Sequence, residues 1–253
     1  MGLQLLIGGW KAPSLVDVRG RATFTLWLCG CNLRCPFCHN WRLAETSPEV
    51  CRRVELDRVV EALSEAARLV DMLHVTGGEP LLQPRGLEKL LEASRELGLG
   101  NSVNTNCTLP GILKPMLDRG LVGHVATDLK TPFQQLTGLQ EDAAKRLYNG
   151  FLECLSMLAD YGVEVELRIP VPREIPGYVE LLGESLRKAA EALQGTKWYV
   201  VVNPLRGQPL VTPRDNDWCT KYCNPEQRLV GEVVEVARKF AGKVYVNRTL
   251  LSA

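Results

Sequence analysis

The sequence alternates between segments that favour β-strands and segments that favour amphipathic helices. Strands are marked by β-branched and aromatic residues, and the helices between them by apolar residues at helical spacing. The predicted strands are residues 22–29, 72–76, 101–106, 123–130, 163–171 and 197–203. Six β–α units in a row favour parallel strands joined by right-handed crossovers. We therefore predict an α/β fold, a complete or partial barrel whose chemistry lies at the carboxyl ends of the strands.

The end of the chain departs from this alternation. Residues 204–225 form a polar stretch with several prolines, followed by a predicted helix (226–241) and a short strand (243–247). Irregular connections of this length usually serve a function or move. We predict one barrel over residues 1–203 and an irregular and helical extension over residues 204–253 that packs on the same domain.

Composition and charge favour a cytoplasmic protein that binds no membrane, and they weaken a nucleic-acid partner without excluding one. The 253 residues are 45% hydrophobic and carry a formal net charge of +1, so the chain has no overall basic field. No apolar run approaches the ~20 residues of a membrane-spanning helix, and the N-terminus lacks the basic leader of a signal peptide. In the cytoplasm thiols stay reduced, and clustered cysteines more often bind metal than form disulfides.

Four of the nine cysteines lie in one short segment, "LWLCGCNLRCPFCHNW" (26–41), directly after the first predicted strand. Their spacing suggests a set of three, Cys31, Cys35 and Cys38, with Cys29 left over. Iron–sulfur clusters are normally held by four thiolates, so three thiolates on a four-iron cluster leave one iron open. An open coordination position is typical of a catalytic metal. A zinc site completed by His39 is the alternative.

A second motif separates these alternatives. The pattern C-x3-C-x-φ-C, with Phe37 as the aromatic residue, resembles the radical S-adenosylmethionine (SAM) superfamily. "GGEP" (77–80) directly follows the second predicted strand, where that family places a SAM-binding turn. A zinc site does not explain this turn. The resemblance implies a partial (β/α)6 barrel of the radical SAM type, with a [4Fe-4S] cluster on Cys31, Cys35 and Cys38 and with SAM as second cofactor.

The resemblance also implies the chemistry. SAM would chelate the open iron, the reduced cluster would pass one electron to the sulfonium, and the resulting 5′-deoxyadenosyl radical would abstract hydrogen from a substrate. The protein orients these cofactors and excludes quenchers. Gly77 and Gly78 would permit close backbone approach, and Glu79 would pair with the SAM ammonium group.

Residues 14–40 resemble a narrower group, the glycyl-radical-enzyme activating proteins, and especially those of anaerobic ribonucleotide reductase. The likeness implies a glycyl radical enzyme as partner and an electron donor such as ferredoxin or flavodoxin. Arg168 would meet the SAM carboxylate, which suits a planar guanidinium. The cofactor-binding residues implied are Phe37, His39, Gly77, Gly78, Glu79, Pro80, Asn104, Thr105, Asp128, Lys130, Arg168 and Asn203.

Some positions depart from that group. Activating enzymes commonly carry Asp-Thr-Asn-Gly where this chain has residues 104–107, "NTNC", and some carry His where this chain has Asn203. These departures leave a second hypothesis open, a radical SAM enzyme that modifies a nucleoside, a small molecule or a peptide side chain. A third hypothesis is a cluster-binding module without turnover, in which residues 77–80 would have no role.

Three further cysteines keep open interpretations. Cys219 and Cys223 lie four residues apart in the polar stretch and could begin a second metal site, remain thiols or form a disulfide. Cys107 follows the third predicted strand, where it could be a catalytic thiol or could line the pocket.

Overall fold

The computed structural model describes residues 2–173 and 175–247 of the chain. The chain divides into two compact units, Met1–Asn32 with Asn40–Val125, and Leu33–His39 with Ala126–Ala253. The second unit thus includes seven residues from the middle of the cysteine segment. The predicted boundary at residue 203 stays a prediction, and the last six residues of the predicted extension lie outside the described part.

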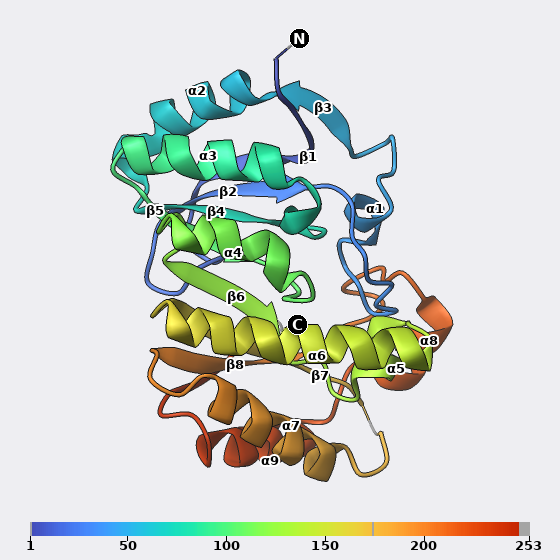
Figure 1. The fold of residues 1–253 in the computed structure, drawn as a ribbon. Helices are drawn as coiled ribbons and strands as arrows, with labels where there is room; N and C mark the ends of the chain where they lie inside the picture. Colours follow the sequence, from blue (N-terminus) through green and yellow to red (C-terminus); the bar gives the residue numbers. More distant parts are fainter. Residues whose placement is uncertain (1, 174, 248–253) are drawn as a thin grey trace. The chain divides into compact units, whose positions relative to one another are not determined.

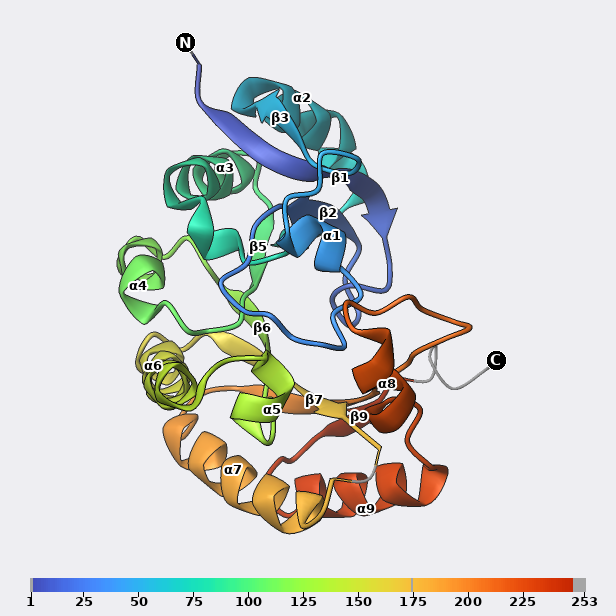
Figure 2. The same ribbon diagram turned by 90° about the vertical axis from the view of Figure 1, so that its right-hand side faces the viewer.

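The first unit contains a five-stranded sheet and its helices (Figure 1). Its strands lie in the order β3-β1-β2-β4-β5; β2, β4 and β5 are parallel, and β1 pairs antiparallel with β2 and β3. Figure 2 shows α3 and α4 on the same side of these strands, and Figure 1 shows α1 beyond the carboxyl end of β2. The elements are β1 (Gln4–Ser14), β2 (Thr23–Leu28), α1 (Trp41–Ala44), β3 (Arg52–Glu55), α2 (Leu56–Ala66), a 3-10 turn (Ala67–Leu69), β4 (Met72–Gly77), a 3-10 turn (Pro80–Leu82), α3 (Pro84–Glu96), β5 (Gly100–Asn104) and α4 (Pro110–Asp118).

The second unit continues the β–α alternation. β6 (His124–Asp128) ends in this unit, where the Leu129 amide donates to the Arg168 carbonyl, and β7, β8 and β9 follow in parallel. Helices α7 and α9 lie side by side along these strands (Figures 1 and 2). The remaining elements are α5 (Phe133–Thr137), α6 (Glu141–Asp160), β7 (Glu164–Val171), α7 (Tyr178–Ala192), β8 (Trp198–Pro204), α8 (Asn216–Tyr222), α9 (Gln227–Arg238) and β9 (Val244–Val246).

The predicted α/β class and its six strands are confirmed, in a mostly parallel sheet that does not close. Two strands escaped the sequence analysis because their pattern is poor. In β1 the buried Leu5 and Ile7 are followed by two glycines and the exposed Trp10, so the period-two alternation stops. The polar stretch 204–225 is not irregular throughout, because it contains α8.

A buried polar chain crosses the first unit on one face of its parallel strands. The Ser102 hydroxyl lies 2.8 Å from Nδ1 of His74 and 2.8 Å from Nδ1 of His124. All three side chains are buried. One hydroxyl carries one proton, so it can donate to one imidazole and accept from the other. Ser102 therefore provides a hydrogen-bond partner for one ring nitrogen of each buried histidine. The backbone pairing of the strands and the apolar side chains of the core offer no such partner.

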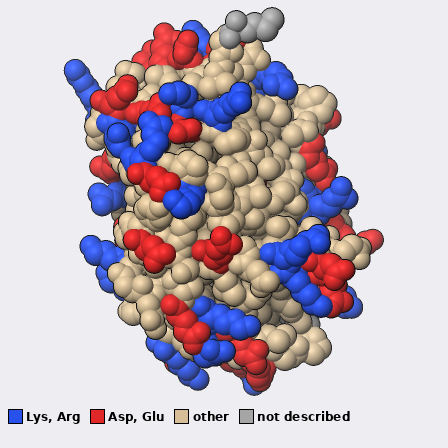
Figure 3. All heavy atoms as spheres, in the orientation of Figure 1, with Lys and Arg blue, Asp and Glu red and all other residues tan. Residues whose placement is uncertain are grey.

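The surface agrees with the balanced composition. On the face shown in Figure 3, basic and acidic side chains are interspersed rather than segregated by sign. Within residues 2–173 and 175–247, no helix is both long enough and apolar enough to cross a membrane.

Candidate active site

The glycine turn after β4 packs against the backbone that leads into the cysteine segment. The Gly78 amide donates to the Leu28 carbonyl at 2.8 Å, and the Glu79 amide donates to the Gly30 carbonyl at 2.7 Å. A Cβ atom on Gly78 would lie 2.0 Å from the Gly30 oxygen, and one on Gly77 would lie 2.3 Å from the Leu28 oxygen. Gly77 also has a φ of 111°, which side chains disfavour. The two glycines thus allow the turn to pack closely against the backbone of Leu28 and Gly30, a role that does not depend on SAM.

Glu79 is fully buried and ties this turn to the end of β5. Its Oε1 accepts hydrogen bonds from the Leu81 amide (3.0 Å) and the Thr105 hydroxyl (2.8 Å), and its Oε2 accepts one from the Asn106 amide (2.7 Å). The structure therefore joins Glu79 and Thr105, two of the predicted site residues. Pairing of Glu79 with a SAM ammonium group stays a prediction.

A side-chain network that the sequence analysis missed surrounds the first predicted cluster ligand. Asn106 Nδ2 donates to Asn32 Oδ1 at 2.7 Å and lies 4.0 Å from Cys31 Sγ. Thr108 bridges the same two asparagines, since its hydroxyl donates to Asn106 Oδ1 and accepts from Asn32 Nδ2. Hydrogen bonds to sulfur tune iron–sulfur potentials. The sequence held one signal of this network, the side-chain amide of Asn32 directly after Cys31.

The end of β5 explains one departure from the resembling group. Asn104 Nδ2 donates to the Thr76 hydroxyl at 2.9 Å, so this predicted site residue is fixed to the end of β4. Cys107 is fully buried and has a φ of 56°, a conformation that glycine adopts more easily. This chain thus places a buried thiol in a left-handed conformation where the resembling group commonly carries glycine.

In the second unit, residues 33–39 carry the other two predicted cluster ligands. Phe37 is buried, and its ring lies 6.0 Å from that of Trp218. His39 Nε2 lies 3.2 Å from the Arg206 carbonyl oxygen. Burial lowers the pKa of His39, and the contact with that carbonyl offsets this only in part. A lowered pKa favours the neutral imidazole, whose Nε2–H then donates to the carbonyl.

Charged side chains form a row across β6, β7 and β8 of the second unit. Lys130 Nζ donates to Asp128 Oδ2 at 2.9 Å, and Arg168 Nε donates to Glu166 Oε1 at 2.5 Å. The Tyr199 hydroxyl donates to the other Glu166 oxygen at 2.7 Å. Lys130, Glu166 and Tyr199 are buried. The two acids and two bases give this row no net charge.

Charges within the row shift the pKa values of its own members. Burial favours neutral Asp128, but the charges of Lys130 and Arg168 outweigh it and lower the pKa of Asp128. Burial also opposes the charge of Arg168, but Glu166 and Asp128 outweigh it and raise the pKa of Arg168. Burial, reinforced by Glu166, raises the pKa of Tyr199. Tyr199 therefore remains a hydrogen-bond donor, and Arg168 remains charged and anchored at Nε.

Glu166 and Tyr199 were not among the predicted site residues. Glu166 stands two residues before Arg168 in a strand, so the two side chains share a face, and this signal was present in "ELR" (166–168). Tyr199 is paired with Glu166 only by the register of β7 and β8, which the sequence does not show.

Asn203 stands on β8 opposite Pro170 of β7. Its Oδ1 is buried and has no hydrogen-bond partner among the described residues. A buried amide oxygen without a donor is costly. A bound molecule that offers an N–H or O–H group would satisfy it.

The cysteines separate into two disulfides and five residues outside them. Cys29 is bonded to Cys51 and Cys219 to Cys223, whereas Cys31, Cys35 and Cys38 take no part in a disulfide. Among the described residues no three His, Cys, Asp or Glu side chains form a single-ion metal site. For Cys219 and Cys223 the disulfide therefore replaces the metal interpretation. The disulfide was one of the interpretations left open for Cys219 and Cys223, whereas the Cys29–Cys51 disulfide was not foreseen.

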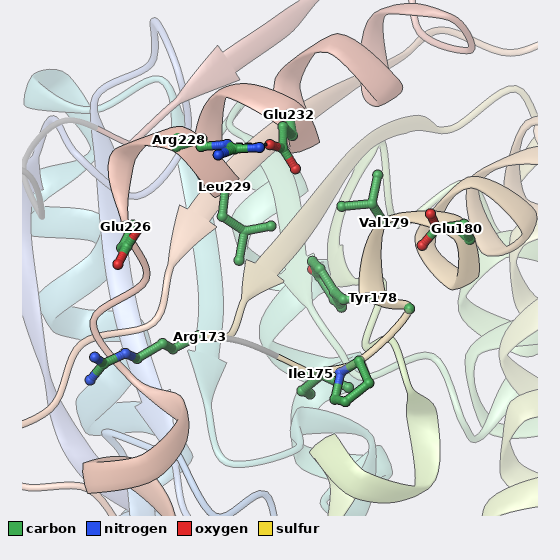
Figure 4. A pocket seen from close by; sticks show the side chains of 11 residues that line it. Arg173, Ile175, Tyr178, Val179, Glu180, Glu226, Arg228, Leu229 and Glu232 are labelled. Carbon is green, nitrogen blue, oxygen red and sulfur yellow. Dashed lines mark hydrogen bonds and ion pairs between the residues drawn. The ribbon is translucent and has the colours of Figure 1, made fainter.

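A pocket in the second unit is lined by none of the predicted site residues. That pocket, of about 600 Å³, lies between the beginnings of α7 and α9 (Figure 4). Arg228 and Glu232 form an ion pair at its rim, and Arg173 extends away from them. No predicted cofactor residue contributes to it.

Comparison with known families decides the family to which the chain belongs. The model of the Radical SAM superfamily matches residues 26–182, more than half of the chain. The chain belongs to the radical SAM superfamily. It is a radical SAM enzyme, and the family's cofactors are a [4Fe-4S] cluster and SAM.

Two relatives show different kinds of likeness. A Methanocaldococcus jannaschii protein, provisionally named a glycyl-radical enzyme activating enzyme, is 22% identical over 97% of both chains. The 7-carboxy-7-deazaguanine synthase of Hyperthermus butylicus is 38% identical, but the match covers 46% of this chain and 50% of that protein. This chain thus spans about half the length of the synthase.

Solved structures agree on the fold. A spore photoproduct lyase variant with bound AdoMet and dinucleoside spore photoproduct matches with a TM-score of 0.66 at 14% identity, covering 93% of this chain and 78% of the lyase chain. This likeness supports the predicted partial barrel.

The described residues fit the two family cofactors. Thiolates are the donors that iron–sulfur clusters use, and Cys31, Cys35 and Cys38, which take no part in a disulfide, would provide three of them. Asn203 Oδ1 is buried and accepts no hydrogen bond from the described residues, so a bound SAM could donate one to it. When bound, these cofactors supply the one-electron cleavage that makes a carbon radical.

Proposed function

We propose that this radical SAM enzyme activates a glycyl radical enzyme, such as an anaerobic ribonucleotide reductase, by removing hydrogen from a backbone glycine. The observation that supports this is the match to the Methanocaldococcus jannaschii protein, which runs through 97% of both chains. The synthase match is stronger residue for residue but stops at about half of each chain. An end-to-end match includes the parts of the chain that would select a substrate.

The site assignments form part of this proposal. Cys31, Cys35 and Cys38 would hold the cluster. The first unit would contribute Gly77–Pro80, Asn104 and Thr105 to SAM binding. The second unit would contribute Phe37, His39, Asp128, Lys130, Arg168 and Asn203.

The charged row explains how Arg168 could recognise a carboxylate. Its Nε is held by Glu166, and a guanidinium has two further nitrogens in the same plane. Lys130 and Asp128 neutralise each other nearby, so an arriving zwitterionic amino-acid group would meet no excess charge. Fixing the guanidinium before binding reduces the ordering cost of the complex.

The reaction balances with one external electron. With both cofactors bound, one electron from a ferredoxin or flavodoxin would supply the cleavage of SAM to methionine and a carbon radical, and the hydrogen atom lost from the glycine Cα would end in 5′-deoxyadenosine. The residues named above would hold SAM in this proposal.

The test is a reconstitution with the partner. Anaerobically loaded protein, SAM, dithionite and the glycyl radical enzyme of the source organism should give a glycyl radical in EPR and about one 5′-deoxyadenosine per radical. A Cys35→Ala variant serves as the control and should give neither. If 5′-deoxyadenosine forms only when a pterin is supplied and no protein radical appears, the activating function is wrong.

One observation supports the alternative in which the substrate is a small molecule. The 38% identity to 7-carboxy-7-deazaguanine synthase favours a small-molecule substrate as the alternative. The two functions differ in a single measurement, namely whether the deuterium of a labelled partner glycine or of a labelled small molecule enters 5′-deoxyadenosine.

A further inference from the structure

Residues 205–224, here called the brace, contact the half of the cysteine segment that carries Cys35 and Cys38. Both belong to the second unit. The Asp215 amide donates to the Pro36 carbonyl at 3.0 Å, and Arg214 Nη1 donates to the Leu33 carbonyl at 3.4 Å. His39 Nε2 lies 3.2 Å from the Arg206 carbonyl oxygen. The contacts come from two places in the brace, Arg206 and the adjacent Arg214 and Asp215, and they reach residues 33, 36 and 39 of the segment.

Helix α8 presents an aromatic side chain to the same segment. The Trp218 ring lies 6.0 Å from the ring of Phe37, which stands directly before Cys38. Asp215 fixes the start of this helix, because its Oδ1 accepts the Trp218 amide at 2.8 Å. An N-cap of this kind stabilises a short helix. The ring of Trp218 is therefore held in place by the same residue that binds the Pro36 carbonyl.

The brace is closed on itself. The Cys219–Cys223 disulfide joins the last turn of α8 to the residue that follows it. The Asn224 amide donates to the Leu205 carbonyl at 2.8 Å, which brings the two ends together. A Cβ atom on Gly207 would lie 2.9 Å from Cys219 Sγ, so the disulfide packs directly on the strand-end loop. A helix of seven residues gains its order from such closure rather than from its own hydrogen bonds.

The other side of the cysteine segment is held by α5. The Arg34 amide donates to the Thr137 carbonyl at 2.9 Å, and a Cβ atom on Gly138 would lie 2.3 Å from the Arg34 carbonyl oxygen. Residues of both elements line a hollow of about 550 Å³ beside Pro36. Contacts from both sides explain why residues 33–39 belong to the second unit although their sequence neighbours belong to the first.

We propose that the disulfide-closed brace positions Cys35 and Cys38 for the iron–sulfur cluster, with Trp218 as the principal positioning residue. Metal ligands are oriented by the groups that pack and hydrogen-bond behind them, and loss of such groups weakens metal retention. The proposal assigns a role to "WCTKYC" (218–223), which the family motifs leave unexplained. It holds for either substrate considered above.

The test compares Trp218→Ala with Thr220→Ala after anaerobic reconstitution. Thr220 is an exposed residue of the same helix whose hydroxyl bonds only within α8, so it is the matched control. The measurement is the rate at which a chelator removes iron. We expect Trp218→Ala to lose iron about two- to tenfold faster than the control, the range for one aromatic pair. Trp218→Phe should restore most of the retention.

A second variant and a second measurement keep the test decisive. The double variant Cys219→Ser/Cys223→Ser should also lose iron faster, while the iron loaded at the start stays near the control. The thermal midpoint of the metal-free proteins should differ little between Trp218→Ala and Thr220→Ala. Equal iron-loss rates in all variants would overturn the proposal, and so would a fall in the metal-free midpoint large enough to explain the faster loss.

Discussion

The hydroxyl of Tyr199 donates a hydrogen bond of 2.7 Å to Glu166, and Glu166 uses its other oxygen to hold Arg168 at Nε. A residue of β8 thus sets the orientation of a guanidinium on β7. The pKa of Tyr199 is raised by burial and by Glu166, so the hydroxyl keeps its proton at neutral pH and remains a donor.

Tyr199→Phe should therefore weaken SAM binding while leaving the cluster intact. The loss of a hydrogen bond to a charged group costs about 1.5–3 kcal/mol. Because Tyr199 acts on SAM only through Glu166 and Arg168, we expect the free energy of SAM binding to fall by about 1 kcal/mol, which is roughly a fivefold higher Kd. SAM titration of reconstituted protein, with iron counts, measures this. Tyr178→Phe is the control, since Tyr178 is also buried and bonds only to the Pro170 carbonyl. An unchanged Kd in Tyr199→Phe would remove Arg168 from the SAM site.

Gly78→Ala should damage the start of the cysteine segment. The new Cβ atom would stand 2.0 Å from the Gly30 oxygen, which is backbone and cannot rotate away. We expect a loss of about 1–3 kcal/mol in unfolding free energy, together with lower iron content. Gly231→Ala in α9 is the control, because nothing lies within 4 Å of its added Cβ and alanine favours a helix by about 0.5–1 kcal/mol. Similar stabilities for the two variants would contradict the assigned packing.

Ser102→Ala should destabilise the first unit. It removes the one hydroxyl that both His74 and His124 contact at Nδ1, and a buried polar group left without its partner costs about 1–3 kcal/mol. Urea unfolding measures the change. Ser156→Ala, an exposed site on α6, should stay within about 0.5 kcal/mol of the parent. If Ser102→Ala did the same, the polar chain would have no energetic role.

The pH dependence of stability should include a contribution from Asp128. Its pKa in the folded protein is lowered because Lys130 and Arg168 outweigh its burial. A lowered folded pKa contributes stability above the unfolded value, about 3.9, and this contribution disappears as the pH falls through the folded pKa. The parent should thus exceed Asp128→Asn in stability at neutral pH, and the difference should shrink below about pH 4. Denaturant midpoints across this range decide it; a constant difference would contradict the charge pairing.

The sequence by itself determined the chemistry and the class of fold. The spacing of the cysteines in the sequence placed Cys31, Cys35 and Cys38 in one segment. Hydrophobic periodicity located the ends of all six predicted strands to within two residues. Both signals are local, so they survive without knowledge of the rest of the molecule. The glycine turn was also legible, although its closest neighbours turned out to be Leu28 and Gly30.

Only the tertiary structure decided which distant residues support that chemistry. Tyr199 reaches Glu166 through strand register, Asn106 reaches Asn32 across 74 residues of sequence, and the brace reaches Pro36 across about 180. Cys219 and Cys223 form a disulfide in the folded chain, whereas their spacing in the sequence left metal ligands, thiols and a disulfide all open. Such contacts form when strands pair and loops pack against distant parts of the chain. Packing and hydrogen bonding act between residues that are close in space, and the number of residues between them in the sequence does not reveal that closeness.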